Sequence, residues 1–446
     1  MNKIHSASHI TTLPEFDLFT VPPTQLTIDK NIVTEHRPIA PISDNNIAPI
    51  EIFVNSAIDE YIQLRETLLY FKLKINIKKK DGTDPTAVTE WAKIQPVNNL
   101  LHSIFKNVDL EVEGQSVTFS PQTYAYKAYF ENYLGFTENS KQGFLSSIGW
   151  YYDEPYKNEI KATQSKWITP GTFIADGTGK SIALIGKLNL DLAFQPRALL
   201  GGTRLKFTLL PNNPNFYLWN KDDTLSVSVK FEDLVLYLTR SKLNPQIVEA
   251  QNLALTKTTA KYPIMRGNVK SFIINSGNLE ATIDNCILGQ IPRRVFVVMV
   301  DHTAANGALK ENPFYFNHNK LNYLTLSVDG VQYPSIAYTP DFENDLYARE
   351  YIGLYDTLNQ ITTDSALQLT YEEFKNGNTI FGFNLAPDPT DDCNKVGYVN
   401  PTQYGAIRLH LKFKEALTKN INVLLYCEYD NTIELDSTRH VFLDYN

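Results

Sequence analysis

VDLEVEG at residues 108–114 has a counterpart in LTLSVDG at residues 324–330. In both segments apolar and polar residues alternate and a Gly ends the run, which is typical of a half-buried β-strand followed by a tight turn. The two segments lie at an offset of 216 residues. An offset of this size indicates the duplication of a whole domain.

Three further pairs keep the same order along the chain. They are FVNS (53–56) with IINS (273–276), Pro121 and YLG (133–135) with Pro340 and YIG (351–353), and Arg204-Leu205 with Arg408-Leu409. One such pair alone is weak evidence of duplication, because β-strands have similar compositions and chance matches are common. Four pairs in register favour a tandem duplication.

Short apolar or alternating segments, ended by Gly, Pro, Asn or Asp, are the dominant signal in the chain after residue 48. The first series is 49–54, 68–77, 108–114, 184–194, 203–210 and 225–238, and the second is 269–275, 293–300, 324–330, 379–385, 407–413 and 421–429. A turn is predicted at KKKDG (78–82), and helices only at 87–105, interrupted at Pro96, and at 121–134.

The predicted fold is all-β, with two tandem eight-stranded jelly rolls (a double jelly roll) at 49–245 and 246–446 and few short helices. Eight strands need about 100 residues, and the remainder of each copy would form loops such as 137–183 and 386–404. The expected linker is SKLNPQIVEAQNLAL (241–255).

Residues 1–48 are predicted to form an extended N-terminal arm, since they contain five prolines and no sustained period. The arm has three basic and five acidic residues, a net charge of −2, which argues against holding nucleic acid. Its spaced apolar residues predict contacts with a neighbouring copy, although the arm could instead cover its own first domain. These expected contact residues are Phe16, Leu18, Phe19, Val21 and Leu26.

The composition of the 446-residue chain is 43% hydrophobic and 20% charged, which excludes a disordered tail, a collagen and a coiled coil. The longest apolar run, 295–300, is too short to span a membrane, and the N-terminus lacks the apolar core of a secretory signal. Three scattered cysteines and the absence of an acceptable Asn-x-Ser/Thr site predict a protein that is made and kept inside the cell. The net charge of −8 disfavours a sequence-specific nucleic-acid partner.

No catalytic, cofactor-binding or metal-binding residue is predicted. ADGTGKS (175–181) ends like a phosphate-binding loop, but Ile174 occupies the position of the first Gly. Asp301 and His302 with His318 form only a loose metal candidate, and so does the Asp-rich loop around Asp388, Asp391, Asp392 and Cys393. Lys78-Lys79-Lys80 is interpreted as a solvated turn.

Nine longer segments together carry a family resemblance. They are FDLFTVPPTQ (16–25), YIQLRETLLYFKLKI (61–75), PVNNLLHSIFKNVDLEVEG (96–114), YAYKAYFENYL (124–134), FQPRALLGGTRLKFTL (194–209), VKSFIINSG (269–277), LGQIPRRVFVVMVD (288–301), NPFYFNHNKLNYLTLSVDG (312–330) and INVLLYCEYDNTIELDSTRHVFLDY (421–445). Through these segments the chain resembles the hexon-like, double jelly-roll major capsid proteins of Polinton/Maverick elements and adintoviruses.

The resemblance implies a homotrimer whose six jelly rolls form a pseudo-hexagonal capsomer. Such capsomers tile the icosahedral shell of a double-stranded DNA virus or integrating element, with a separate penton protein at the vertices. The protein would then reside in the virion and have no enzymatic activity.

Two other classes of function stay open at the level of sequence. The first is a carbohydrate-binding protein, because jelly rolls also serve as lectins and Trp150, Tyr151, Tyr152 and Trp167 could stack on sugars. The second is a glycoside hydrolase, for which no pair of carboxylates stands out.

Overall fold

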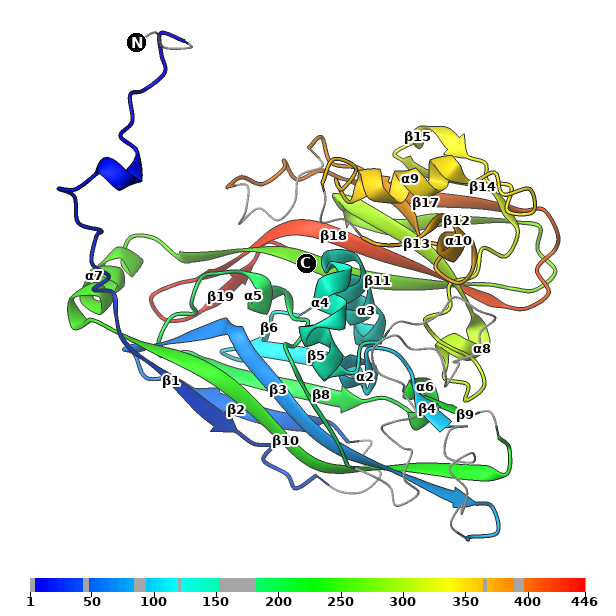
Figure 1. The fold of residues 1–446 in the computed structure, drawn as a ribbon, viewed down its shortest axis with the longest axis horizontal. Coiled ribbons are helices and arrows are strands. Elements are labelled where there is room, and N and C mark those ends of the chain that lie inside the picture. The colour runs from blue at the N-terminus through cyan, green and yellow to red at the C-terminus, as the bar shows by residue number, and fades with distance from the viewer. Residues whose placement is uncertain are drawn as a thin grey trace.

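Two β-domains lie one above the other in the computed structural model (Figure 1). The structure describes residues 5–42, 48–83, 94–118, 122–151, 181–220, 222–363, 367–388 and 397–445. Buried apolar side chains of both domains form one continuous core, so the two halves share an interior.

The first half of the chain folds into two antiparallel sheets of four strands each, ordered β1-β10-β3-β7 and β2-β8-β5-β6. Their bounds are β1 (Ile28–His36), β2 (Ile50–Asn55), β3 (Glu60–Lys79), β5 (Phe105–Val112), β6 (Gln115–Ser116), β7 (Ser181–Gly186), β8 (Arg204–Pro211) and β10 (Leu225–Leu243). A separate short pair joins β4 (Ile94–Pro96) to β9 (Leu218–Asn220).

The second half repeats this arrangement with the sheets β11-β18-β13-β16 and β12-β17-β14-β15. Their bounds are β11 (Ala260–Ile274), β12 (Glu280–Gln290), β13 (Arg294–Asp301), β14 (Leu321–Val328), β15 (Val331–Tyr338), β16 (Phe381–Asn384), β17 (Tyr404–Phe413) and β18 (Ile421–Leu435), with β19 (Val441–Leu443) added beside β18.

The strand order is the same in both halves. Counted along each half, strands one, eight, three and six form one sheet, and strands two, seven, four and five form the other. Two four-stranded sheets with this order are a jelly roll. The predicted double jelly roll is therefore confirmed.

The duplication extends to the turn that follows the fourth strand. Both two-residue loops have positive φ at both positions, 51° and 82° at Glu113-Gly114 and 48° and 87° at Asp329-Gly330. This is the geometry of a type I′ hairpin. The two carboxylates also act alike, because the Arg204 amide donates to Glu113 Oε1 at 2.7 Å and the Ala406 amide donates to Asp329 Oδ1 at 2.8 Å.

Three of the four sequence pairs lie in equivalent elements. VDLEVEG and LTLSVDG begin in the fourth strands, YLG and YIG lie in helices that follow the fifth strands, and the Arg-Leu pairs lie in the seventh strands. The Arg-Leu match is two residues out of register, because Val112 pairs with Leu205 whereas Val328 pairs with Ile407. The FVNS–IINS match is wrong, since it joins the end of a second strand (β2) to the end of a first strand (β11).

The helices are short and few, as predicted. They are α2 (Leu100–Ser103), α3 (Tyr124–Gly135), α4 (Glu138–Gln142), α5 (Asp191–Phe194), α6 (Pro214–Tyr217), α7 (Pro245–Leu255), α8 (His302–Ala305), α9 (Ala348–Thr357) and α10 (Tyr371–Lys375), with 3-10 turns η1 (Pro14–Phe16) and η2 (Phe144–Ile148). The helix predicted at 121–134 is confirmed as α3. The turn at 78–82 is also present, because β3 ends at Lys79 and Gly82 has a φ of 87°.

The helix predicted at 87–105 is wrong over its described part. Residues 94–105 instead contain β4, the single turn α2 and the start of β5, and residues 87–93 lie outside the described residues. Asn99 interrupts any continuous helix here, because its φ of 58° is left-handed.

Two other boundaries differ from the prediction. Residues 28–36, assigned to the arm, form β1, which pairs with β10 as the edge of the first jelly roll. The expected linker is mostly the helix α7, which Asn244 caps by accepting a hydrogen bond from the Gln246 amide. Within the described residues, the extended arm is therefore the part that precedes β1, and it leaves the body of the molecule beside α7 (Figure 1).

Candidate functional site

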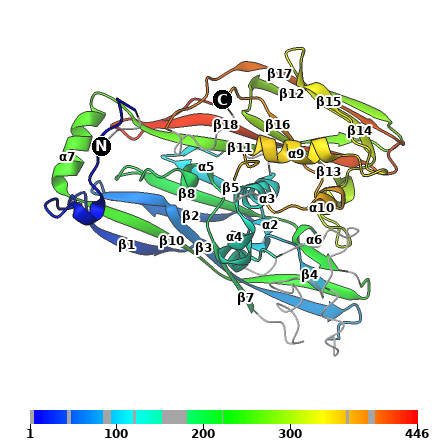
Figure 2. The same ribbon diagram turned by 45° about the horizontal axis from the view of Figure 1, so that its top comes forward.

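Helix α3 lies between the two jelly rolls (Figures 1 and 2). Its aromatic side chains face in several directions, and a helix that is apolar on most sides is buried. The Tyr129 ring stacks on Phe314 at 4.2 Å between centroids, and the Phe130 ring stacks on Phe316 at 5.5 Å and on Tyr426 at 5.3 Å. The helix belongs to the first half, whereas these three partners belong to the second.

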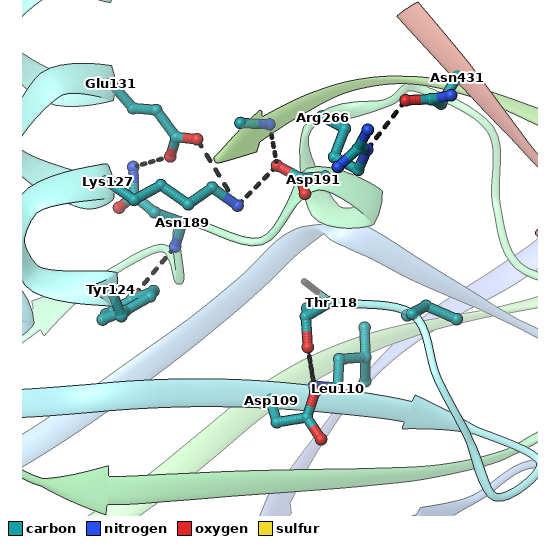
Figure 3. Close-up of polar contacts among 12 residues, drawn as sticks. Asp109, Leu110, Thr118, Tyr124, Lys127, Glu131, Asn189, Asp191, Arg266 and Asn431 are labelled. Carbon is teal, nitrogen blue, oxygen red and sulfur yellow. Dashed lines mark hydrogen bonds and ion pairs between the residues drawn. The ribbon is translucent and has the colours of Figure 1, made fainter. Parts of the chain in front are cut away.

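A buried ion pair lies in the same interface (Figure 3). Lys127 Nζ of α3 is 2.6 Å from Asp191 Oδ1 of α5, and both side chains are less than 5% exposed. The amide of Gly267 in β11 donates to the same oxygen at 3.1 Å, which links the pair to the second jelly roll. A Cβ at Gly267 would lie 2.9 Å from Glu131 Oε1, so a larger residue at this position would displace side chains of the cluster.

Glu131 is the third ionisable group of this cluster. It lies 3.7 Å from Lys127 Nζ and accepts a hydrogen bond from Asn189 at 2.9 Å. Burial raises the pKa of Glu131 to about 8, although Lys127 opposes this shift. Burial disfavours the charge of Lys127 as well, but Asp191 and Glu131 outweigh it and leave the pKa of Lys127 above its ordinary value. The cluster is thus a buried Lys–Asp pair beside a carboxyl whose charged form is disfavoured by burial.

The C-terminal segment also connects the halves. The Tyr445 hydroxyl donates to the Val117 carbonyl at 2.8 Å, and Arg439 Nε donates to the Gly201 carbonyl at 2.9 Å. Arg266 lies over the rings of Tyr429 and Tyr445, at 4.2 and 4.7 Å from their centroids. With α3, these contacts fix the two jelly rolls in one orientation. A solute cannot reach Lys127 or Asp191, so the cluster suits a structural role.

The five predicted contact residues of the arm are fully accessible in the single chain. Phe16, Leu18, Phe19, Val21 and Leu26 are 72, 76, 93, 87 and 71% exposed. The arm of this structure therefore does not cover its own first domain with these side chains. The predicted contacts of these residues with a neighbouring copy stay a prediction, for which exposed apolar side chains are a prerequisite.

The first metal candidate does not converge on a common point. Asp301 pairs with Lys419 at 3.0 Å, His302 Nδ1 is 2.7 Å from Asn422 Oδ1, and the His318 ring stacks on Phe342 at 4.2 Å. Across the described ranges, no three His, Cys, Asp or Glu side chains are grouped as metal ligands would be. Residues 391–393 of the second candidate lie outside these ranges.

The aromatic residues considered for sugar stacking are buried where the structure describes them. Trp150 and Tyr151 are both 3% exposed, and the Tyr151 hydroxyl donates to the Pro96 carbonyl at 3.0 Å. Tyr152, Trp167 and residues 175–180 of the phosphate-loop candidate lie outside the described residues. Trp150 and Tyr151 therefore pack beneath the surface and cannot stack on a sugar.

The described cysteines are buried free thiols, Cys286 and Cys427, and burial raises their pKa values to about 11 and about 12. Their thiolates are disfavoured, which makes them poor nucleophiles. No helix in the described part of the chain combines the length and the apolar content that a membrane span needs.

One cavity was not anticipated from the sequence. It has a volume of about 490 Å³ and lies where α7 meets the start of β1 and the start of β11. Its walls come from β1, β3, β10, α7, β11 and the segment before β8, so no local pattern could have predicted it. Figure 1 shows that the arm leaves the molecule at the same end.

No family model matches the sequence. An uncharacterized protein of Caenorhabditis elegans is 29% identical over 413 residues, which are 89% of this chain and 93% of that protein.

Solved structures with the same fold are viral. A chain of the Sputnik virophage structure has a TM-score of 0.62 and 11% identity, covering 99% of this chain and 94% of that one. The mavirus major capsid protein has a TM-score of 0.56 and 11% identity (100% and 97% covered), and the Faustovirus major capsid protein has a TM-score of 0.56 and 9% identity (95% and 92% covered). At these identities the likeness concerns the fold, which is that of double jelly-roll proteins.

Proposed function

We propose that this protein is a major capsid protein, with no enzymatic activity, whose trimers form pseudo-hexagonal capsomers. The observation that carries the proposal is the repeated strand order of two jelly rolls, since whole-chain neighbours with this fold include major capsid proteins of mavirus and Faustovirus. Three copies of a chain with two similar domains present six similar faces, which suits a hexagonal lattice.

The rigid joint between the jelly rolls supports this role. A capsomer subunit must keep its shape while its edges bind neighbouring subunits. Helix α3 and the Lys127–Asp191 pair hold the two domains of the chain together. The exposed series from Phe16 to Leu26 then supplies contacts between neighbouring capsomers. In this proposal the partners are further copies of the chain and a separate penton or minor capsid protein.

The shell would be icosahedral and would belong to a double-stranded DNA virus or a virus-like integrating element of the Polinton/Maverick–adintovirus kind. The sequence segments quoted for that family support this assignment. The protein would be assembled inside the host cell and reside in the virion.

Two measurements on the purified protein test the proposal. Light scattering is expected to give about three chain masses, because obligate contacts of this kind commonly bury more than about 2,000 Å². Negative-stain images are expected to show pseudo-hexagonal particles that form sheets or closed shells at high concentration. A stable monomer at micromolar concentration would contradict the proposal.

The two described residues named for the carbohydrate-binding alternative do not favour it. Trp150 and Tyr151 are inaccessible. Binding of the protein to defined sugars on a glycan array, together with a monomeric mass, would nevertheless support that alternative over a shell protein.

A further inference from the structure

The cavity beside α7 has an apolar interior and a basic end. Ile28, Leu200, Leu243, Ala254, Leu255 and Tyr262 contribute to its walls. Arg197 and Lys261 also line it. A second cavity, of about 280 Å³, shares Gln63 and Arg197 with the first and adds Arg65, Glu66 and Lys187.

The basic end has more cations than anions. Arg197 donates to the Lys261 carbonyl at 2.5 Å, but has no ion-pair partner among the described residues. Lys261 pairs with Glu434 at 3.7 Å, and Glu66 is the acidic residue of the second cavity. Burial, and then the charge of Arg65, lowers the pKa of Lys187. A ligand that combines an apolar group with a carboxylate would match this surface.

The arm contains such a combination. In PEFDLF (14–19), Phe16, Leu18 and Phe19 alternate with Glu15 and Asp17. The three apolar side chains are exposed, and neither acidic side chain has an ion-pair partner among the described residues. The apolar side chains of this segment are not covered by their own chain, whereas the cavity has the complementary charge.

We propose that PEFDLF (14–19) of one copy binds in the α7 cavity of a second copy. An aromatic ring of the segment enters the apolar part, and Asp17 pairs with Arg197 at the basic end. The proposal rests on the proposed shell function and deepens it, because it names the two surfaces that join neighbouring copies.

The chain's own geometry disfavours insertion of the arm into its own cavity. Thr27 and Ile28 already line the cavity, so the arm would have to reverse between Phe19 and Thr27. Pro22 and Pro23 stand in that stretch and keep the backbone extended. Eight extended residues instead reach about 26 Å, far enough to cross to a neighbour.

Fluorescence anisotropy with a labelled peptide of residues 12–27 tests the site. The receptor is the full chain carrying Asp17→Lys, so that the arms of other receptor copies compete less for the cavity. The peptide is expected to bind, and adding Arg197→Glu or the cavity-filling Ala254→Trp is expected to weaken binding at least about tenfold. Matched controls on the same helix or just after it, Ala250→Trp and Lys257→Glu, are expected to leave binding unchanged.

A charge swap makes the test specific. A peptide carrying Asp17→Lys is expected to bind the Arg197→Glu chain better than the wild-type peptide does. Absence of peptide binding, or equal binding by the cavity variants and their controls, would overturn the proposal.

Mixing full chains separates binding to a second copy from binding within one copy. Chains with only Asp17→Lys and chains with only Arg197→Glu are each expected to associate weakly beyond the trimer in sedimentation. Mixed together they are expected to associate, because the intact arm of the second variant can enter the intact cavity of the first. Lack of rescue on mixing, with peptide binding intact, would assign the arm to its own chain and overturn the proposal.

The two proposals fail in different ways. If wild-type protein and the Arg197→Glu variant form the same particles in electron micrographs, the cavity does not connect neighbouring copies, and the shell function stands. If the peptide binds as described and mixing rescues association but no particles form, the arm site stands and the shell function fails.

Discussion

Lys127 is a charged residue in the interior of the molecule, and its contribution to stability depends on its ion pair with Asp191. Replacing it with Met leaves the Asp191 carboxylate buried, with the Gly267 amide as its remaining described donor. Breaking a buried ion pair on one side costs about 3–5 kcal/mol. We expect Lys127→Met to lower the free energy of unfolding in urea by this amount.

The matched control removes both charges. Lys127→Met with Asp191→Asn is expected to recover part of the loss, since no uncompensated charge remains. A loss below about 1 kcal/mol for the single variant would mean that the pair contributes little to the joint between the jelly rolls.

Glu131 makes the stability depend on pH. Its pKa is about 8 in the folded protein against an ordinary 4.5. The folded state therefore binds this proton more tightly, and the contribution of Glu131 to stability falls as pH rises between these two values. Glu131→Gln keeps an acceptor for Asn189 and cannot ionise. We expect the wild type to match this variant near pH 5 and to melt at a lower temperature at pH 9.

The exposed Glu249→Gln on α7 serves as the control, and it is expected to follow the wild type at every pH. If the melting difference between the wild type and Glu131→Gln does not change with pH, the carboxyl is already ionised in the folded protein.

Strand β1 and the segment before it differ in structural role. Deleting residues 1–24 removes exposed side chains, so we expect an unchanged melting temperature, intact trimers and impaired association between them. Deleting residues 1–36 also removes β1 and exposes the edge of β10, to which β1 is paired over its length. We expect this longer deletion to aggregate or to melt at a clearly lower temperature.

Size-exclusion chromatography and thermal melts distinguish the two deletions. Normal particles from the shorter variant would contradict a linking role for the arm. Failure of that variant to fold would instead assign residues 1–24 to the fold of the first domain.

The elements that the sequence predicts well are those whose period is set by one buried face. β8 and much of β10 are of this kind. The strand predicted at 184–194 ends at Gly186 in the structure. The prediction extended too far because the polar residues Asn189 and Asp191 fit the solvent-facing positions of an alternating strand, whereas both are buried in the network around α3. β1 was missed because its residues are mostly polar and part of its face meets solvent.

The candidate site, too, could be predicted from the sequence only in part. The arm contacts stay a prediction from the sequence, which rests on an apolar series in a Pro-rich segment that has no internal core to fill. The α7 cavity could not be predicted, because its walls come from segments more than 200 residues apart, such as Ile28 and Tyr262. Such a surface exists only after the chain has folded.

Buried contacts around α3 join the cores of the two jelly rolls. We therefore expect the two jelly rolls to unfold as one cooperative unit. We expect calorimetry to show a single unfolding transition. Phe130→Ala, which removes a ring stacked on Phe316 and Tyr426 of the second half, is expected to cost about 3–5 kcal/mol and to move that whole transition.

Phe71→Ala is the informative comparison, because the Phe71 ring contacts the rings of Phe105 and Phe231, which both belong to the first jelly roll. In a coupled molecule this variant also shifts the single transition, since neither half unfolds alone. If it instead splits the transition and leaves one part at the wild-type temperature, the second jelly roll is stable by itself. The halves would then be independent modules joined through α7, and the interface would orient them without stabilising them.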